Sequence, residues 1–239
     1  MDTIIFDVDD TLYDQALSFH TTFRKLIGDH FSYKDIDQIY RASRHYSEML
    51  FDQSERGEIT VFDWQIGRII RACEDFEIPL DQEKATTFHH FYAREQANIK
   101  LFPEVIELFD LLKQSSKQLA ILTNGETDHQ SMKIKQLQLN QWVLSKHIYI
   151  SGSYGYAKPK KEIFKIVEEE LACNPNETVY VGDSYEKDII GAKQAGWKAV
   201  WFNHRNREVP KNSRWYADKE VHSAKELLAY FQKLDSLQC

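Results

Sequence analysis

The stretch Thr3-Ile4-Ile5-Phe6-Asp7-Val8-Asp9-Asp10-Thr11-Leu12 decides the fold of this chain. A short apolar, β-branched run opens directly onto acidic residues and a threonine. This order is typical of a buried parallel strand that ends in a polar turn. Side chains two apart on an extended chain point the same way, so we expect Asp7 and Asp9 to share one pocket at the strand's C-terminal end. In open α/β sheets, ligands bind at that edge.

Two carboxylates held close together repel each other unless a cation bridges them or one of them keeps a proton. Such a pair can supply a nucleophile and a general acid. Asp and Thr also cap helices and complete turns, so the motif alone is compatible with a purely structural role. The rest of the chain must decide between the two interpretations.

Composition limits the class of protein and of partner. The 239 residues are 42% hydrophobic and 13% aromatic, which suffices for one large domain or for a domain that carries an inserted smaller one. The formal charge of −7 argues against a nucleic-acid polymer as partner. Because no apolar stretch is long enough to span a bilayer and no basic-then-apolar start is recognisable, we expect neither a membrane span nor a removable signal. Three scattered cysteines without metal-ligand spacing favour a reducing cytoplasm, so we expect a cytoplasmic protein without a membrane partner.

After Asp14 the apolar residues follow helical spacing, and we expect residues 15–99 to form a bundle of about four helices. Thr60 with Asp63 resembles a capping box, and Asp81 is a plausible N-cap. One stripe at positions i, i+3, i+4 and i+7 consists of Ile66, Ile69, Ile70 and Cys73.

From Pro103 onward, strand and helix patterns alternate, which predicts a Rossmann-like parallel sheet with right-handed crossovers. The first strand then belongs to this later α/β domain, and the helical block interrupts it. We therefore predict an α/β core formed by residues 1–14 and 100–239, with an inserted all-helical cap over residues 15–99.

Further polar residues stand where the predicted strands end. The strand at 119–122 leads into Thr123-Asn124-Gly125, whose hydroxyl, amide and glycine could cradle an anion. Lys158 precedes a proline, which biases its backbone toward an extended conformation. Read separately, these are also an ordinary N-cap turn and an ordinary solvated lysine.

Acidic residues end the next strand as well. The strand at 178–181 leads to Asp183, which would lie beside Asp7 if the two strands are neighbours. Three acidic groups with water would match the oxygen coordination of Mg²⁺. Asp188 follows one turn later and could orient a bound water or Lys158.

Taken together and in this order, the four motifs make the chain resemble a hydrolase of the haloacid dehalogenase superfamily, a largely phosphatase group with a Rossmann-like core. Asp7-Val8-Asp9-Asp10-Thr11 resembles the first motif of the superfamily, Thr123-Asn124 the second and Lys158-Pro159 the third. Gly182-Asp183 through Asp188 resembles the fourth. The helical insertion lies between the first and second motifs, where the α-helical cap of the family belongs.

The resemblance implies a role for each matching residue. Asp7 would be the nucleophile that forms an aspartyl-phosphate, and Asp9 the general acid and base. Mg²⁺ would be held by the Asp7 carboxylate, the Asp9 backbone carbonyl and Asp183, with support from Asp188. The phosphoryl oxygens would be bound by Thr123, the Asn124 backbone and Lys158. An acid at the Asp9 position favours phosphate esters over halides and phosphonates, since an alkoxide leaving group needs a proton.

Other functions remain open at this stage. A phosphomutase shares the same core motifs and differs in how its cap excludes water. A member acting only as a binding or regulatory partner is a second alternative. A phospho-receiver module is disfavoured, because about eighty helical residues separate the first acidic pair from the next strand.

The substrate class is the least determined part. The general layout most resembles the nucleotidase and phosphoglycolate phosphatase branches, so we expect a small phosphomonoester, with a nucleoside 5′-monophosphate as the first candidate. Cap residues that could contact the leaving group are Phe19, His20 and Tyr46. The oligomeric state is not indicated by the sequence.

Overall fold

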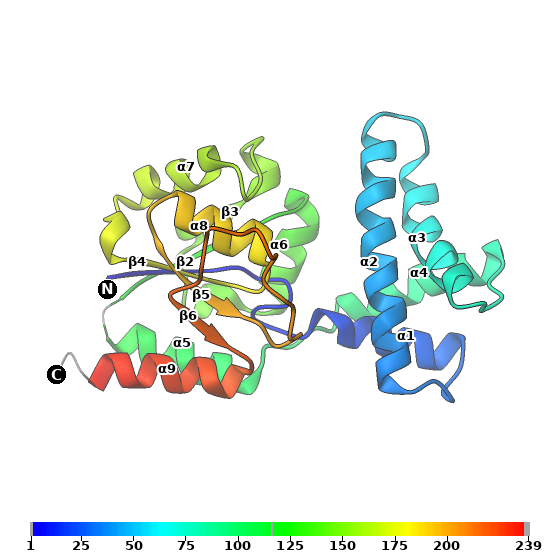
Figure 1. Cartoon of the computed structure of the whole chain (residues 1–239), viewed down its shortest axis with the longest axis horizontal. Helices are drawn as coiled ribbons and strands as arrows, with labels where there is room; N and C mark the ends of the chain where they lie inside the picture. The colour runs from blue at the N-terminus through cyan, green and yellow to red at the C-terminus, as the bar shows by residue number, and fades with distance from the viewer. Residues whose placement is uncertain (1, 116, 237–239) are drawn as a thin grey trace. The chain divides into compact units, whose positions relative to one another are not determined.

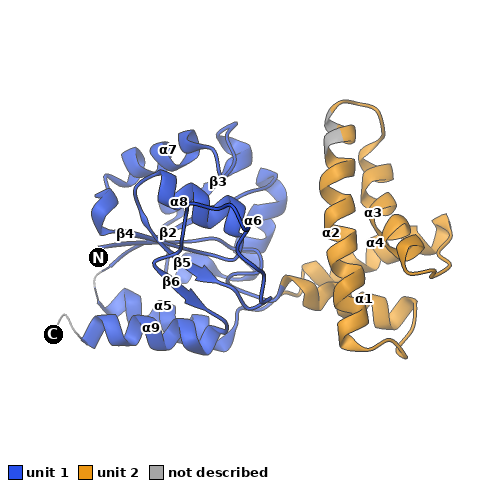
Figure 2. Ribbon diagram, viewed as in Figure 1, with its two compact units in different colours: residues 1–14, 100–239 blue, residues 15–99 orange. Residues whose placement is uncertain are grey.

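The computed structural model describes residues 2–115 and 117–236, and it divides the chain into two compact units (Figure 2). Unit 1 consists of residues 1–14 and 100–239, and unit 2 consists of residues 15–99. Each unit is described by itself below.

Unit 1 is built on one parallel sheet of six strands in the order β3-β2-β1-β4-β5-β6 (Figure 1). The α/β fold predicted from the alternating pattern is therefore confirmed. Along the chain the strands are β1 (Thr3–Phe6), β2 (Gln118–Thr123), β3 (Ile148–Ile150), β4 (Thr178–Gly182), β5 (Lys198–Phe202) and β6 (Lys219–Val221).

Helices cover both faces of this sheet, and alternate residues of β1 serve the two faces. Phe6 packs against the rings of Phe109 on α5 and Phe231 on α9, with centroid distances of 5.0 and 6.4 Å. Ile5 belongs to the buried cluster that includes Phe164 of α7. Burial on both sides explains the continuous apolar run that opens the sequence. The helices are α5 (Pro103–Gln114), α6 (Thr127–Gln136), α7 (Lys161–Leu171), α8 (Ile190–Gln194) and α9 (Ala224–Ser236).

Short helical turns complete the connections of unit 1. A π-helical turn, Tyr185–Ile189, leads directly into α8. Single 3₁₀ turns are Leu139–Gln141, Ser145–His147, Ser151–Ser153 and Pro175–Glu177.

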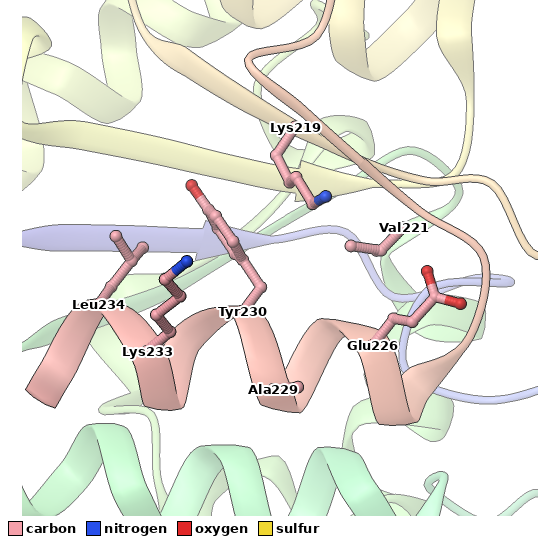
Figure 3. A pocket seen from close by; sticks show the side chains of 7 residues that line it. All are labelled: Lys219, Val221, Glu226, Ala229, Tyr230, Lys233 and Leu234. Atoms are coloured by element: carbon pink, nitrogen blue, oxygen red, sulfur yellow. The ribbon is translucent and has the colours of Figure 1, made fainter.

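The edge strand β6 was absent from the sequence prediction. Its first two residues, Lys219 and Glu220, are exposed, and only Val221 is buried. A three-residue strand with one buried side chain carries too little apolar pattern to be recognised. Figure 3 shows the surface pocket that β6 forms with α9. None of the motif residues contributes to it, and its lining residues are Lys219, Val221, Glu226, Ala229, Tyr230, Lys233 and Leu234.

Unit 2 is helical throughout its regular structure, as the spacing predicts. The predicted caps are present, because Thr60 and Asp63 form a reciprocal capping box and the Asp81 side chain accepts from the Lys84 backbone. Aromatic and aliphatic side chains from all four helices fill its core. The helices are α1 (Gln15–Leu26), α2 (Tyr33–Glu55), α3 (Val61–Asp75) and α4 (Gln82–Gln96). Within the described part of the chain, no helix has both the length and the apolar character that a membrane span requires.

The sheet order brings the motif-bearing strand ends together. β1 lies in the middle, hydrogen-bonded to β2 on one side and to β4 on the other. The chain order reverses between β1 and β4, which is the topological switch point where open sheets of this kind place ligands. Where the chain returns from unit 2, the Phe102 backbone N–H donates to the Leu12 carbonyl at 3.0 Å. The returning segment is thereby fixed beside the first motif.

Candidate active site

Asp7 is held at the C-terminal end of β1 by both its backbone and its side chain. Its backbone N–H continues the ladder to the Val181 carbonyl of β4 at 2.9 Å. Its carboxylate is buried, with Oδ1 accepting from Lys158 Nζ at 2.7 Å and Oδ2 accepting from the Thr11 hydroxyl at 3.2 Å. The orientation of this carboxylate is therefore set from two sides.

Asp183 and Asp188, which follow the neighbouring strand β4, lie close to Asp7. One oxygen from each of the three buried carboxylates lies within 4.8 Å of the other two. Asp188 sits in the π-helical turn and accepts from the Ser184 backbone at 2.9 Å. Gly182 permits this fold, because a Cβ there would come within 2.4 to 2.7 Å of the Asp188 side chain. The structure thus brings together three acidic residues that the sequence places 5 to 181 positions apart.

Lys158 lies among these carboxylates with its side chain only 2% exposed. Its Nζ donates to Asp7 Oδ1, to Asp188 Oδ1 and to the Tyr180 hydroxyl, each at 2.7 Å. Asn124 fastens the backbone that carries the lysine, since its side chain accepts from the Lys158 N–H and donates to the Lys158 carbonyl, both at 2.9 Å. The second and third motifs are therefore in direct contact.

Tyr180 was not among the predicted site residues. It lies on β4, where its pattern matches any buried strand residue, and only the sheet order places its hydroxyl beside Lys158. The same hydroxyl donates to the Leu122 carbonyl of β2 at 2.8 Å and so spans from β4 to β2.

The electrostatics show an excess of negative charge. Burial, together with the nearby charges of Asp188 and Asp9, raises the pKa of Asp7 to about 7 despite the opposing effect of Lys158. Burial and the charge of Asp10 raise the pKa of Asp183 well above its usual value. For Lys158, burial opposes the charged form, but Asp188 and Asp7 outweigh it and raise the pKa of the ammonium. One ammonium therefore does not offset three buried carboxylates.

This donor set fits a hard divalent cation. Mg²⁺ takes oxygen ligands at about 2.1 Å in octahedral geometry, so two ligand oxygens lie about 3 to 4 Å apart. The spacing of the Asp7, Asp183 and Asp188 oxygens is compatible with this, and a cation would offset the negative charge of the cluster. We predicted a supporting role for Asp188, and its carboxylate lies within the cluster itself.

The Asp9 carboxylate is held mainly by side chains of α6. Both of its oxygens accept from Lys133 Nζ at 2.7 Å, Oδ2 also accepts from the Gln130 amide at 3.0 Å, and Oδ1 accepts from the Tyr13 hydroxyl. Burial opposes ionisation, but the charge and hydrogen bonds of Lys133, with those of Tyr13 and Gln130, lower the pKa of Asp9 to about 2. The carboxylate is therefore ionised at neutral pH in this structure.

Thr123 lies at the end of β2, where its buried hydroxyl is 3.4 Å from Gln130 Oε1. Gln130 also donates to the Asn124 carbonyl at 3.1 Å. Thr123, Asn124, Lys158 and Asp7 are thus linked through short contacts, and a phosphoryl group bound at this strand edge would meet them together.

Asp10 anchors a second group of cations that sequence reasoning missed. Arg205, in the loop after β5, donates to both Asp10 oxygens at 2.9 and 2.7 Å and also to Asp14. Burial raises the pKa of Asp10, but hydrogen bonds from His204 and Arg205 reverse this and lower it. Arg207 of the same loop donates to Asp183 Oδ2 at 2.9 Å. These contacts tie the β5 loop to the first and fourth motifs.

The three predicted specificity residues belong to unit 2. Phe19 is 1% exposed and packs among the aromatic rings of the unit's core. His20 is buried and stacks on Tyr33 with 4.2 Å between ring centroids. The Tyr46 hydroxyl donates to the Asp75 carboxylate at 2.9 Å. Their role in specificity stays a prediction.

Comparison with known families now identifies the fold and its chemistry. The model of the haloacid dehalogenase-like hydrolase family matches residues 1–196. The chain belongs to this family. The superfamily predicted from the four ordered motifs is thereby confirmed, and the chain is a hydrolase of the haloacid dehalogenase type.

Individual relatives of this haloacid dehalogenase-like hydrolase carry different names. The pyrimidine 5′-nucleotidase YjjG of Escherichia coli (strain K12) is 28% identical over 233 residues, covering 95% of this chain and 97% of that protein. A glyceraldehyde 3-phosphate phosphatase of Pyrococcus furiosus is 32% identical over 123 residues, covering 51% of this chain and 50% of that protein. The crystal structure of the HAD-hydrolase YfnB of Bacillus subtilis superposes with a TM-score of 0.70 at 24% identity, covering 96% and 97% of the two chains. The structural similarity to YfnB shows that the two chains share a fold.

The Arg205–Asp10 pair supports a stability prediction. Replacing Arg205 by Met should lower the free energy of unfolding of unit 1 by about 3–5 kcal/mol, because a buried carboxylate loses its bidentate partner. Urea unfolding followed by tryptophan fluorescence would measure this. Lys165→Met, which breaks the exposed Lys165–Glu169 pair of the same unit, should change it by less than about 1 kcal/mol. Equal effects of the two substitutions would contradict the importance of the buried pair.

The carboxylate cluster supports a prediction of metal binding. Mg²⁺ should raise the melting temperature of the wild-type protein, since a ligand that binds only the folded state at a hundredfold excess over its Kd stabilises by about 2.7 kcal/mol. Asp183→Asn should lose most of this increase, because one of the three clustered carboxylates is then neutral. Differential scanning calorimetry with Mg²⁺ and with EDTA measures the shift. Asp29→Asn, at an exposed carboxylate of unit 2, is the matched control. An unchanged Mg²⁺ response in Asp183→Asn would overturn the assignment.

Proposed function

We propose that this chain is a Mg²⁺-dependent phosphatase that hydrolyses a small phosphomonoester through an aspartyl-phosphate on Asp7. The observation that carries this proposal is the arrangement of Asp7, Lys158, Asp183 and Asp188 at the switch point of the sheet, with Asp9 two residues beyond the nucleophile. The phosphatase names of its relatives support it.

In the first half of the reaction, an Asp7 oxygen attacks phosphorus while the bond from phosphorus to the ester oxygen breaks. Asp9 is ionised in the free protein, so it must take up a proton from solvent as the substrate binds. It then gives this proton to that oxygen, and the leaving group departs as an alcohol. Lys158, Thr123 and the Asn124 backbone bind the phosphoryl oxygens and keep the attack in line. Lys158 contacts Asp7 directly, so it can align nucleophile and phosphoryl group together.

In the second half, Asp9 takes a proton from water, and the water oxygen attacks phosphorus. The bond from phosphorus to Asp7 breaks, which releases inorganic phosphate and restores the Asp7 carboxylate. Asp7, the Asp9 backbone carbonyl and Asp183, supported by Asp188, would hold Mg²⁺. When bound, the ion supplies positive charge that offsets the charge on the phosphoryl oxygens.

The substrate class we propose to test first is the nucleoside 5′-monophosphates. Support comes from the near full-length similarity to a protein named as a pyrimidine 5′-nucleotidase. A phosphomutase and a non-catalytic binding protein are the alternatives. The first would convert a sugar phosphate to its isomer, and the second would release no phosphate from any ester.

Phosphate release from a panel of phosphomonoesters tests the proposed reaction. The panel comprises nucleoside monophosphates, phosphoglycolate, sugar phosphates and p-nitrophenyl phosphate, each with Mg²⁺ and with EDTA. We expect Mg²⁺-dependent release, which Asp7→Asn should reduce to background because an amide oxygen is a poor nucleophile. Asp29→Asn should retain wild-type rates. The proposal would be wrong if the wild-type protein released no phosphate from any ester, or if Asp7→Asn turned over substrate at a near-wild-type rate.

The acid role of Asp9 makes a separate prediction. Asp9→Asn should lower kcat/KM for phenyl phosphate by about a hundredfold more than for p-nitrophenyl phosphate, because a nitrophenolate leaves without needing a proton. Steady-state kinetics on the two esters, which differ only in the nitro group, measures the ratio. Equal losses on both would argue against proton donation by Asp9.

A further inference from the structure

Lys133 is a buried lysine that the roles assigned so far do not use. Its side chain, on α6, is only 2% exposed, and its Nζ donates to both oxygens of Asp9 at 2.7 Å. Lysine is rarely so deeply buried, because removing an ammonium from water is costly unless its partner is well placed. The neighbouring Lys135 of the same helix is exposed, as an ordinary helix lysine is.

The Asp9 carboxylate accepts hydrogen bonds from Lys133 and from two further side chains. Gln130, one turn earlier on α6, donates to Asp9 Oδ2, and the Tyr13 hydroxyl donates to Oδ1. Gln130 also reaches the Asn124 carbonyl. The carboxylate is therefore fixed by a cage that belongs largely to one helix, and this helix begins just after the second motif.

We propose that Lys133 is a positioning residue for Asp9: from within unit 1 it fixes where the Asp9 carboxylate lies and which way it points. Lys133 neither gives nor receives the proton, which passes from Asp9 to the ester oxygen as the bond to phosphorus breaks. This inference rests on the proposed function, because it needs Asp9 to act as general acid.

A displacement of the Asp9 carboxylate has a specific kinetic consequence. Proton transfer requires donor and acceptor within about 3 Å, and a shift of about 1 Å can cost a hundredfold in rate. Lys133 donates to Asp9, whereas Asp7 and Asp188 are bound by Lys158, so phosphoryl binding keeps its own supports. kcat/KM reports on the first half of the reaction, before Asp9 acts as base, so removing the ammonium should lower kcat/KM far more for esters that need a proton than for esters that do not.

The test compares Lys133→Met with Lys135→Met on phenyl phosphate and p-nitrophenyl phosphate, in the wild-type and the Asp9→Asn backgrounds. In the wild-type background, Lys133→Met should lower kcat/KM for phenyl phosphate by about a hundredfold and for p-nitrophenyl phosphate by less than about fivefold. In the Asp9→Asn background it should cost less than about threefold on either ester, because the group it positions no longer donates a proton. Lys135→Met should behave as its parent in both backgrounds.

Several outcomes would overturn the inference. Equal losses on both esters, or the same loss with and without Asp9, would show that Lys133 only supports the fold. If circular dichroism shows that Lys133→Met is unfolded, Lys133→Arg carries the test, since it keeps a buried cation but places its N–H donors differently. Lys133→Arg should then lose activity on phenyl phosphate selectively, and an equal loss on both esters counts against positioning.

Failure of the proposed function gives a different result. If the wild-type protein hydrolyses neither ester, or if Asp9→Asn loses both equally, the general-acid mechanism itself fails. If Asp9→Asn is selective and Lys133→Met is not, only the role of Lys133 is overturned.

Discussion

The crowding of buried carboxylates at the C-terminal edge of β1 and β4 is the constraint on which the rest of this structure depends. Asp7, Asp183 and Asp188 meet there around one ammonium, that of Lys158. Like charges at this distance raise one another's pKa values, as they do for Asp7, and each further cation that the fold supplies lowers that cost. The segments that follow β3, β4 and β5 are therefore held in place by charge as well as by packing.

The cations divide the acidic residues into groups with different chemistry. Lys133 holds Asp9, and Arg205 holds Asp10 together with Asp14. Asp7 and Asp188 share Lys158, and Asp183 accepts from Arg207. In the proposed function, a divalent ion would offset the negative charge of this last group. In the proposed mechanism, aspartates at one edge of the sheet thus serve as nucleophile, as proton carrier and as structural anchor.

The sequence predicts one half of these ion pairs well and the other half poorly. Asp7, Asp183 and Lys158 were predictable because each ends or follows a strand, and parallel strand ends meet at one edge whatever lies between them. Lys133 and Arg205 were not, because no motif marks either residue. Their separations from the carboxylates they bind, 124 and 195 residues, are comparable with the 151 residues between Lys158 and Asp7. On its helix, Lys133 has the local pattern of a solvated lysine, and only the packing of α6 against the first motif buries it. β6 was not predicted for a different reason. Its exposed Lys219 and Glu220 leave too little of the apolar pattern by which a buried strand is recognised.

The same logic explains why the substrate is harder to infer than the reaction. In the proposed mechanism, Asp7, Asp9, Lys158 and the other core groups would act on the phosphoryl group or on the oxygen next to it. All phosphomonoesters share those atoms, so a core built for them cannot separate a nucleotide from a triose phosphate. Such a core is compatible with relatives that are named as a nucleotidase and as a glyceraldehyde 3-phosphate phosphatase. Discrimination must come from side chains that meet the rest of the substrate. These lie outside the four motifs, so the strength of the motif evidence for the chemistry carries no information about the leaving group.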